Sequence, residues 1–224
     1  MYVLVVDTAT PAVTAALAEV GPSEVAIRAS RATVNARAHG ELLTPQISGV
    51  LAEAGIRPPD LEAIVAGVGP GPYTGLRVGL VTATAMGQAL GVPTYGVCSL
   101  DGIGAASAEP GRLVAATDAR RREIYWRAYD SGTPITDPAV DQPVAVARQL
   151  QALGIVRALG DGAVRYAEVL AVPVADEPRY PDPLTLARLA ADRVRAAAPT
   201  EVLTPLYLRR PDATLPGTRK PVLR

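Results

Sequence analysis

A segment rich in glycine and proline is the clearest candidate for ligand chemistry in this chain. The segment 69–80, GPGPYTGLRVGL, follows the apolar run 63–66 and leads into a helical pattern. The first N–H groups of a helix lack intrahelical partners, so a strand, a loop and a helix in this order often hold a phosphate. Pro70 and Pro72 offer no N–H, however, and no lysine stands where a P-loop would need one. The spacing therefore predicts a weakened phosphate site.

An aspartate at the end of the first predicted strand is the second candidate. Asp7 precedes Thr8 at a turn where phosphotransferase-type folds place a phosphate or Mg²⁺ loop. Ala9 and Pro11 stand where such a loop needs a glycine and free N–H groups. We therefore favour a structural Asp7 that accepts turn N–H bonds, and expect ATP or ADP binding to be weak or vestigial. The residues of this vestigial nucleotide site would be Asp7, Thr8, Gly69, Gly71 and Thr74.

Nucleophilic and metal-dependent chemistry have few residues to use. His39 is the only histidine, which excludes a two-histidine metal site on this chain. Because it opens an apolar helical pattern, it is interpreted as a helix-start or interface residue rather than a catalytic base. Cys98 is the only cysteine and ends an apolar strand, so it can form no internal disulfide and is expected to pack as a small hydrophobe. The sequence predicts no catalytic residue and no bound metal.

The helix after the loop has the composition of a packed interface. With Thr74 as its predicted N-cap, the span 75–90 holds a single charged residue, Arg77. Its apolar side chains point in several directions, so more than one side of it should be covered. Small residues recur every four positions, which lets another backbone approach closely, either the chain's own sheet or a partner. This stripe consists of Gly75, Gly79, Ala83 and Gly87.

Composition limits the possible classes of protein. The 224 residues are 49% apolar, enough for one large domain or two small ones. Basic and acidic residues number 22 each, so no global field attracts polyanions and free-standing RNA binding is not expected. The start MYVLVVD is typical of a strand rather than a leader, and the helix 75–90 is too short and too interrupted to span a membrane, so we expect a cytoplasmic protein.

The order of predicted elements indicates an α/β protein built twice from one unit. Strands are expected at 2–6, 13–19 and 25–29, a helix within 39–54, a strand at 61–67, and a strand at 94–97 after the helix 75–90. The pattern then begins again, with strands at 113–117, 123–129 and 156–159, a basic turn at 120–122, and helices at 144–153 and 164–170. Asp118 follows the first strand of the second unit, as Asp7 follows the first strand of the first unit. The predicted organisation is a lobe 1–108, a second lobe 109–208, and a flexible, basic, proline-containing tail 209–224.

Five segments together resemble the TsaB family, also called YeaZ, of bacterial tRNA threonylcarbamoyladenosine (t6A) synthesis. They are VLVVDTAT at 3–10, AHGELLTPQI at 38–47, GPGPYTGLRVGL at 69–80, DARRREIYW at 118–126 and PLYLR at 205–209. The resemblance spans nearly the whole chain, although Pro72 and Tyr73 stand where the family usually has Ser-Phe. It implies an actin/Hsp70/sugar-kinase-like (ASKHA) fold, two related lobes with mixed five-stranded sheets flanked by helices.

The resemblance also implies a subunit without chemistry of its own. Members of the family pair with the catalytic subunit TsaD, together with the ATPase TsaE, in threonylcarbamoyl transfer to N6 of adenosine 37 of tRNAs that read ANN codons. TsaD carries a metal-binding HxxxH motif, whereas the corresponding region 97–105 here has no histidine. The implied partners are a TsaD-like subunit, a TsaE-like ATPase, and a second copy when the chain is alone, with tRNA reached only through the complex.

The family pairs through the two helices of its first lobe. In this sequence these are 39–54 and 74–90, and the partner-binding residues carried over are His39, Leu43, Ile47, Val50, Leu76, Gly79, Leu80, Ala83, Met86 and Gly87. The first competing interpretation is an ATP-dependent small-molecule kinase or ATPase of the same fold. The second is a metallopeptidase.

Overall fold

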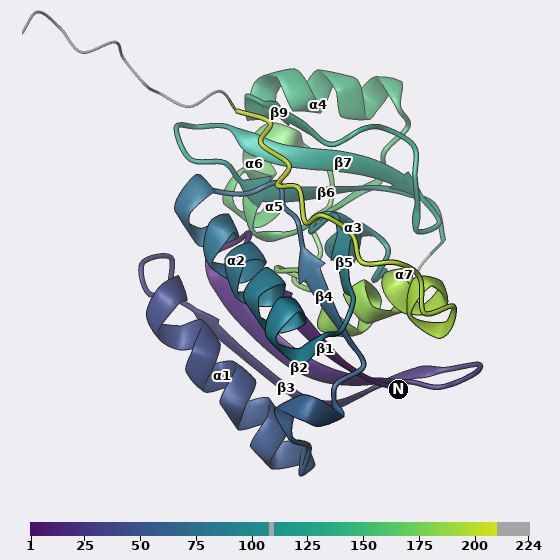
Figure 1. The fold of residues 1–224 in the computed structure, drawn as a ribbon. Coiled ribbons are helices and arrows are strands. Elements are labelled where there is room, and N and C mark those ends of the chain that lie inside the picture. The colour runs from purple at the N-terminus through teal and green to yellow at the C-terminus, as the bar shows by residue number, and fades with distance from the viewer. Residues whose placement is uncertain (108–109, 210–224) are drawn as a thin grey trace, which may run out of the picture.

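Two lobes, each built on a β-sheet, form the structure (Figure 1). The computed structural model describes residues 1–107 and 110–209. Within these ranges no helix combines the length and the hydropathy that a bilayer crossing requires. The predicted tail beyond residue 209 lies outside the described residues.

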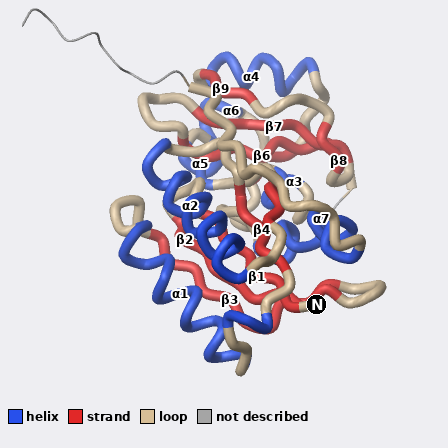
Figure 2. The backbone as a smooth tube through the Cα atoms, in the orientation of Figure 1, coloured by secondary structure: helices blue, strands red, loops and turns tan. Residues whose placement is uncertain are grey.

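The first sheet has five strands in the order β3-β2-β1-β4-β5. Its strands are β1 (Tyr2–Asp7), β2 (Ala12–Val20), β3 (Val25–Val34), β4 (Ala63–Gly67) and β5 (Thr94–Val97). The first three form an antiparallel meander, while β4 and β5 add in parallel to β1, so the sheet is mixed. Helices α1 (His39–Ala54) and α2 (Tyr73–Leu90) lie side by side over one face of this sheet (Figure 2).

The first strand is apolar on both sides because both faces of the sheet are covered. Leu4 and Val6 pack with the cluster beneath α1 and α2, whereas Val3 and Val5 belong to a second cluster on the opposite face. Alternate residues of a strand point to opposite faces, so a continuous apolar run is typical of a strand buried on both sides.

The second lobe repeats this arrangement. Its five-stranded sheet has the order β10-β6-β7-β8, with β9 also paired to β7. The elements are β6 (Arg112–Asp118), β7 (Ile124–Asp130), β8 (Thr133–Pro134), β9 (Ala139–Asp141), α4 (Pro143–Ala152), β10 (Arg157–Leu159), α5 (Asp161–Arg165) and α6 (Ala167–Leu170). As β1 does with β2 and β4, β6 pairs antiparallel with the next strand and parallel with a later one. The predicted fold, two lobes with mixed five-stranded sheets flanked by helices, is confirmed.

Helix α7 (Pro183–Arg195), which was not predicted, follows the second lobe in sequence but packs on the first sheet. Leu186, Ala190 and Val194 are buried in the cluster that covers the face opposite α1 and α2. The N-cap Asp182 accepts a hydrogen bond from the Thr185 N–H at 2.8 Å, with a proline at the first helical position. This start signal and the apolar spacing of four could have predicted the helix.

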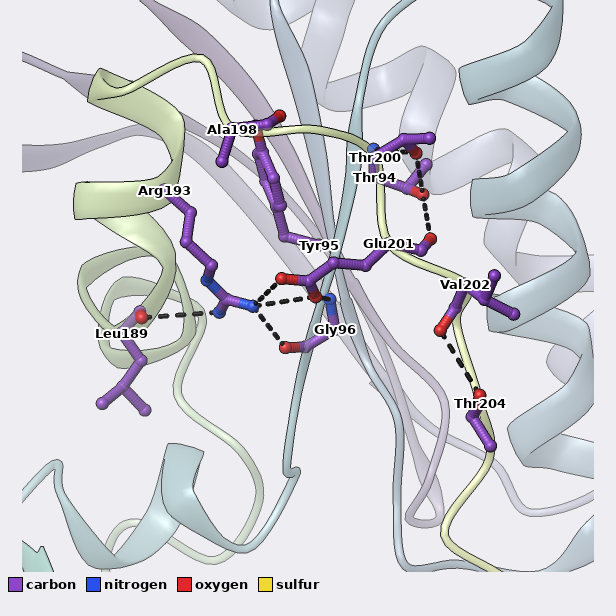
Figure 3. Close-up of polar contacts among 10 residues, drawn as sticks. All are labelled: Thr94, Tyr95, Gly96, Leu189, Arg193, Ala198, Thr200, Glu201, Val202 and Thr204. Carbon is purple, nitrogen blue, oxygen red and sulfur yellow. Dashed lines mark hydrogen bonds and ion pairs between the residues drawn. The ribbon is translucent and has the colours of Figure 1, made fainter.

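After α7 the chain follows the edge of the first sheet. We call residues 198–209 the C-terminal strap. The Glu201 N–H donates to the Thr94 carbonyl at 2.9 Å, and the Glu201 carboxylate accepts from the Gly96 N–H at 3.0 Å (Figure 3). Arg193 of α7 pairs with the same carboxylate at 2.8 Å. The strap therefore satisfies the backbone groups of the edge strand β5 and then continues toward the second lobe.

Several local predictions differ from the structure. Helix α2 begins at Tyr73 with Pro72 at its N-cap, so Thr74 is not the cap. Helix α1 fills the whole predicted range, from His39 to Ala54, and contains Pro45. Two further short helical turns, η1 (Pro58–Asp60) and α3 (Asp101–Gly104), were not predicted.

Candidate functional site

The turn after β1 is closed by hydrogen bonds within the chain. Asp7 is 2% exposed, and its carboxylate accepts from the Ala9 N–H at 2.9 Å and from the Ser99 hydroxyl at 2.6 Å. The Ser99 hydroxyl in turn accepts from the Gly69 N–H at 3.1 Å. The groups that could meet a phosphate or a cation therefore already have partners. Burial, partly offset by these hydrogen bonds, raises the pKa of Asp7 to about 6.

Thr8 joins this turn to helix α2. Its hydroxyl donates to the Gly75 carbonyl at 2.8 Å and accepts from the Gly79 N–H at 3.0 Å. An uninterrupted α-helix would pair these two groups with each other. The threonine hydroxyl therefore bridges the donor and the acceptor of one helical hydrogen bond. A Cβ at position 79 would lie 2.5 Å from the Thr8 Oγ1 atom. The small-residue stripe of α2 therefore seats the helix on its own lobe.

The glycine- and proline-rich loop lies directly on the same turn. A Cβ at Gly71 would lie 2.2 Å from the Ala9 carbonyl oxygen and 2.8 Å from the Ala9 Cα. The loop thus meets a carbonyl oxygen, which repels an anion, where a phosphate loop would present N–H groups. Of the five residues predicted for a vestigial nucleotide site, four are buried and only Thr74 is exposed.

His39 begins α1 and holds it against the turn. Its Nε2–H donates to the Thr10 carbonyl at 2.9 Å, and its ring lies beside Gly75, where a Cβ would be 3.2 Å from Nε2. The imidazole is 9% exposed. Because the Nε2–H of His39 is bonded to a backbone carbonyl, His39 has the geometry of a helix-start residue.

A pocket of about 470 Å³ lies between the lobes. Its first-lobe wall includes Thr8, Thr10 and His39, and its second-lobe wall includes Asp118, Arg120 and Arg165. Asp118 and Arg165 form an ion pair at 3.0 Å. The pocket could hold a small anion, but the described residues contain no cluster of three or more metal-ligating His, Cys, Asp or Glu side chains.

Two other titratable groups lie near the second sheet. Burial raises the pKa of Asp161, which accepts from the Asp118 N–H at 3.4 Å, to about 6. Burial and the nearby Asp101 raise the pKa of Cys98 to about 12, so its thiol stays protonated and unreactive near neutral pH.

Most residues predicted to bind a partner point into the first lobe. Leu43, Ile47, Val50, Leu76, Leu80 and Ala83 are buried in the cluster beneath α1 and α2, Met86 packs against it, and Gly87 faces Thr94. The surface of α2 is instead formed by the positions between them. Besides Tyr73 and Ala89 at its ends, these are Thr74, Arg77, Val81, Thr84, Ala85 and Gln88, and we call these six the outer face of α2. This face was not predicted from the sequence. The helix positions that lie opposite the small-residue stripe would have indicated it.

The two lobes and the pocket between them define the class of protein. Two lobes with mixed five-stranded sheets, joined at an interlobe pocket beside equivalent aspartates, are the architecture of actin-like ASKHA proteins. The structure titled YeaZ from Pseudomonas aeruginosa matches 92% of this chain and 99% of its own, with a TM-score of 0.76 and 27% identity.

Sequence comparisons identify the family within this class. The family model described as TsaD: tRNA N6-adenosine threonylcarbamoyltransferase matches residues 31–168. A Bacillus subtilis protein named tRNA threonylcarbamoyladenosine biosynthesis protein TsaB is 30% identical over 68% of this chain and 66% of its own. An uncharacterized Mycobacterium tuberculosis protein is 46% identical over 94% of this chain and 93% of its own. The chain belongs to the TsaB (YeaZ) family.

Proposed function

We propose that this chain is a non-catalytic, dimer-forming subunit of t6A synthesis. In this proposal it binds a TsaD-like catalytic subunit in the cytoplasm, and a TsaE-like ATPase acts with the pair. The complex transfers threonylcarbamoyl to N6 of adenosine 37 of tRNAs. Family membership supports the pathway, since the Bacillus subtilis relative is named for t6A biosynthesis. The observation that supports the non-catalytic role is the closed turn at Asp7, whose polar groups bond to the chain itself.

The outer face of α2 is the surface proposed for partner binding. Val81 is 60% exposed, and Arg77 is the only charge on the face. A hollow of about 350 Å³ runs beside it, between α2 and the strap residues Leu203 and Pro205. Protein interfaces combine an apolar centre with few charges, which this face provides. A second copy of the chain would use the same face, so homodimer and heterodimer should compete.

Reconstitution of threonylcarbamoyl transfer tests the proposal as a whole. The assay combines TsaD, TsaE, the adenylate-forming enzyme and tRNA, with and without this chain. We expect modified tRNA only when the chain is present, and no phosphoryl transfer or ATP hydrolysis by the chain alone. Equal product without the chain would contradict the proposal. Turnover of ATP by the purified chain would favour the kinase or ATPase interpretation, for which the interlobe pocket offers space.

A charge on the outer face of α2 should weaken TsaD binding without unfolding the chain. Val81→Glu buries an unpaired carboxylate in the proposed interface, so we expect affinity for TsaD to fall at least about tenfold. Val156→Glu is the matched control, because Val156 is 62% exposed on the second lobe. Titration calorimetry measures both affinities, and equal binding by the two variants would reject the face. Ala83 is unsuitable for this test because it is 1% exposed, so a charged replacement would disturb folding.

A further inference from the structure

A second pocket of about 470 Å³ adjoins the interlobe pocket and shares Pro72, Tyr73 and Arg120 with it. Three distant parts of the chain line it. They are the loop before α2 with Gly71, Pro72 and Tyr73, the β6–β7 hairpin with Ala119, Arg120, Arg121 and Tyr125, and the strap with Tyr207, Leu208 and Arg209. Neither the closed turn at Asp7 nor the outer face of α2 accounts for this pocket.

Stacked aromatic rings form one wall of the pocket. The rings of Tyr73 and Tyr207 have centroids 5.2 Å apart and an interplanar angle of 26°. They are 53% and 45% exposed, although burial of such rings is favourable. The guanidinium of Arg77 lies 5.1 Å from the Tyr73 centroid. The strap is what brings the second ring to the first, so the platform exists only in the folded chain.

The charged side chains that line the pocket are all arginines. Its charged lining residues are Arg120, Arg121 and Arg209, with no acidic side chain among them. Arg209 is paired with the Glu123 carboxylate, which offsets its charge, and Asp118 is paired with Arg165 at 3.0 Å. The pocket is therefore electropositive, although the chain as a whole has no net charge.

The hairpin turn that carries these arginines has an unusual backbone. Arg120, Arg121 and Arg122 have φ angles of 61°, 51° and 64°, in the left-handed region that favours glycine. Each such residue costs about 1–2 kcal/mol. Three hydrogen bonds hold the turn. The Arg120 N–H donates to Asp118 at 3.2 Å, the Glu123 N–H to the Arg120 carbonyl at 2.9 Å, and the Ala119 N–H to the Glu123 carbonyl at 3.0 Å. The arginine side chains are thus presented by a fixed turn beside the tyrosines.

From this juxtaposition we infer that the pocket binds a nucleotide unit, with its base stacked on the tyrosine pair and its phosphate at the arginines. Aromatic rings beside cationic groups hold single-stranded nucleic acids in this way without reading their sequence. A volume of 470 Å³ is within the range of small-molecule sites. The same chemistry would fit a nucleotide within an RNA strand and a free mononucleotide. The inference concerns the isolated chain and does not rest on TsaD binding.

Titration of the full-length chain with three probes tests this inference. Fluorescence anisotropy with a labelled single-stranded RNA of about 12 nucleotides measures direct binding, and AMP and inorganic phosphate serve as competitors. We expect RNA to bind and AMP to displace it more effectively than phosphate, because only AMP carries a base. RNA that binds while AMP fails to compete would assign the site to a strand, whereas AMP that binds without RNA would assign it to a mononucleotide. Both results support the pocket.

Four variants connect the binding to the pocket. Tyr207→Ala should weaken RNA binding about 5- to 100-fold, the usual loss of one stacked base, whereas Tyr207→Phe should retain it. Arg120→Gln should weaken binding and reduce its salt dependence, because one phosphate contact is lost. Arg148→Gln on α4 makes the same change in net charge on the exposed far side of the second lobe and should have no effect. Thermal unfolding confirms that each variant is folded.

Three results would overturn the inference. The first is no binding of RNA or AMP by the wild-type chain. The second is equal losses in Arg120→Gln and Arg148→Gln, which would show attraction to charge in general. The third is loss of TsaD binding by Tyr207→Ala without any nucleotide binding, which would assign the pocket to the protein partner and leave the proposed function intact.

Discussion

Asp7→Asn is expected to make the protein more stable near neutral pH and to flatten the dependence of its stability on pH. The pKa of Asp7 is raised from 3.8 to about 6 by burial, so folding favours the protonated form. Its contribution to the free energy of unfolding is fully present below the unfolded pKa and is lost as the pH rises through about 6. Asparagine is uncharged like the protonated carboxyl, and its oxygen can still accept from the Ala9 N–H. The Ser99 hydroxyl, which donates to the carboxylate, must reorient in both cases.

Urea unfolding at about pH 5 and about pH 7.5 measures this effect. For the wild type we expect stability to fall by about 1–1.5 kcal/mol per raised carboxyl between these values. Asp161, whose pKa is also about 6, contributes with the same sign, so Asp161→Asn serves as a parallel variant. A wild-type stability that rises between the two pH values, or an unchanged slope in Asp7→Asn, would contradict the assignment.

Asp7→Ala should have the opposite effect to Asp7→Asn. Alanine leaves the Ala9 N–H and the Ser99 hydroxyl without their acceptor in a buried turn. Each unsatisfied group costs about 1–3 kcal/mol, so Asp7→Ala should lose stability at both pH values. The pair of variants separates the charge of Asp7, which destabilises the fold, from its hydrogen bonds, which stabilise it.

The elements of the fold follow from local pattern, and this explains why most of them could be predicted. The alternation of side chains in β1 and the four-residue spacing in α2 depend only on periods within one element. The repeated order of elements, with Asp7 and Asp118 at equivalent strand ends, made the two-lobed arrangement predictable as well.

The direction in which each face points could not be predicted, because it depends on contacts between distant segments. Gly79 was compatible with a partner or with the chain's own sheet, and only the position of Thr8, 71 residues away, decides between them. Val81 is as apolar as its buried neighbours, yet it is 60% exposed because the sheet lies on the other side of the helix. Likewise, nothing local indicates that the strap returns to place Tyr207 on Tyr73.

The second large effect is expected from a single methyl group at Gly71. The Cβ of Gly71→Ala would lie 2.2 Å from the carbonyl oxygen of Ala9 and 2.8 Å from the carbonyl carbon of Ala9. Both are backbone atoms, which cannot rotate away as a side chain can. Overpacking of this kind usually costs about 1–3 kcal/mol, and a clash with fixed backbone belongs at the upper end. Urea unfolding should show this loss.

Gly40→Ala is the matched control for Gly71→Ala. A Cβ at position 40, in the first turn of α1, would meet no atom within 4 Å. Alanine should therefore stabilise the helix by about 0.4–1 kcal/mol, through its higher helix propensity and a less flexible unfolded chain. If Gly71→Ala were as stable as Gly40→Ala, the loop could not lie on the turn as the structure has it. The space at Asp7 would then be open to a phosphate, and the argument for a non-catalytic chain would lose its physical basis.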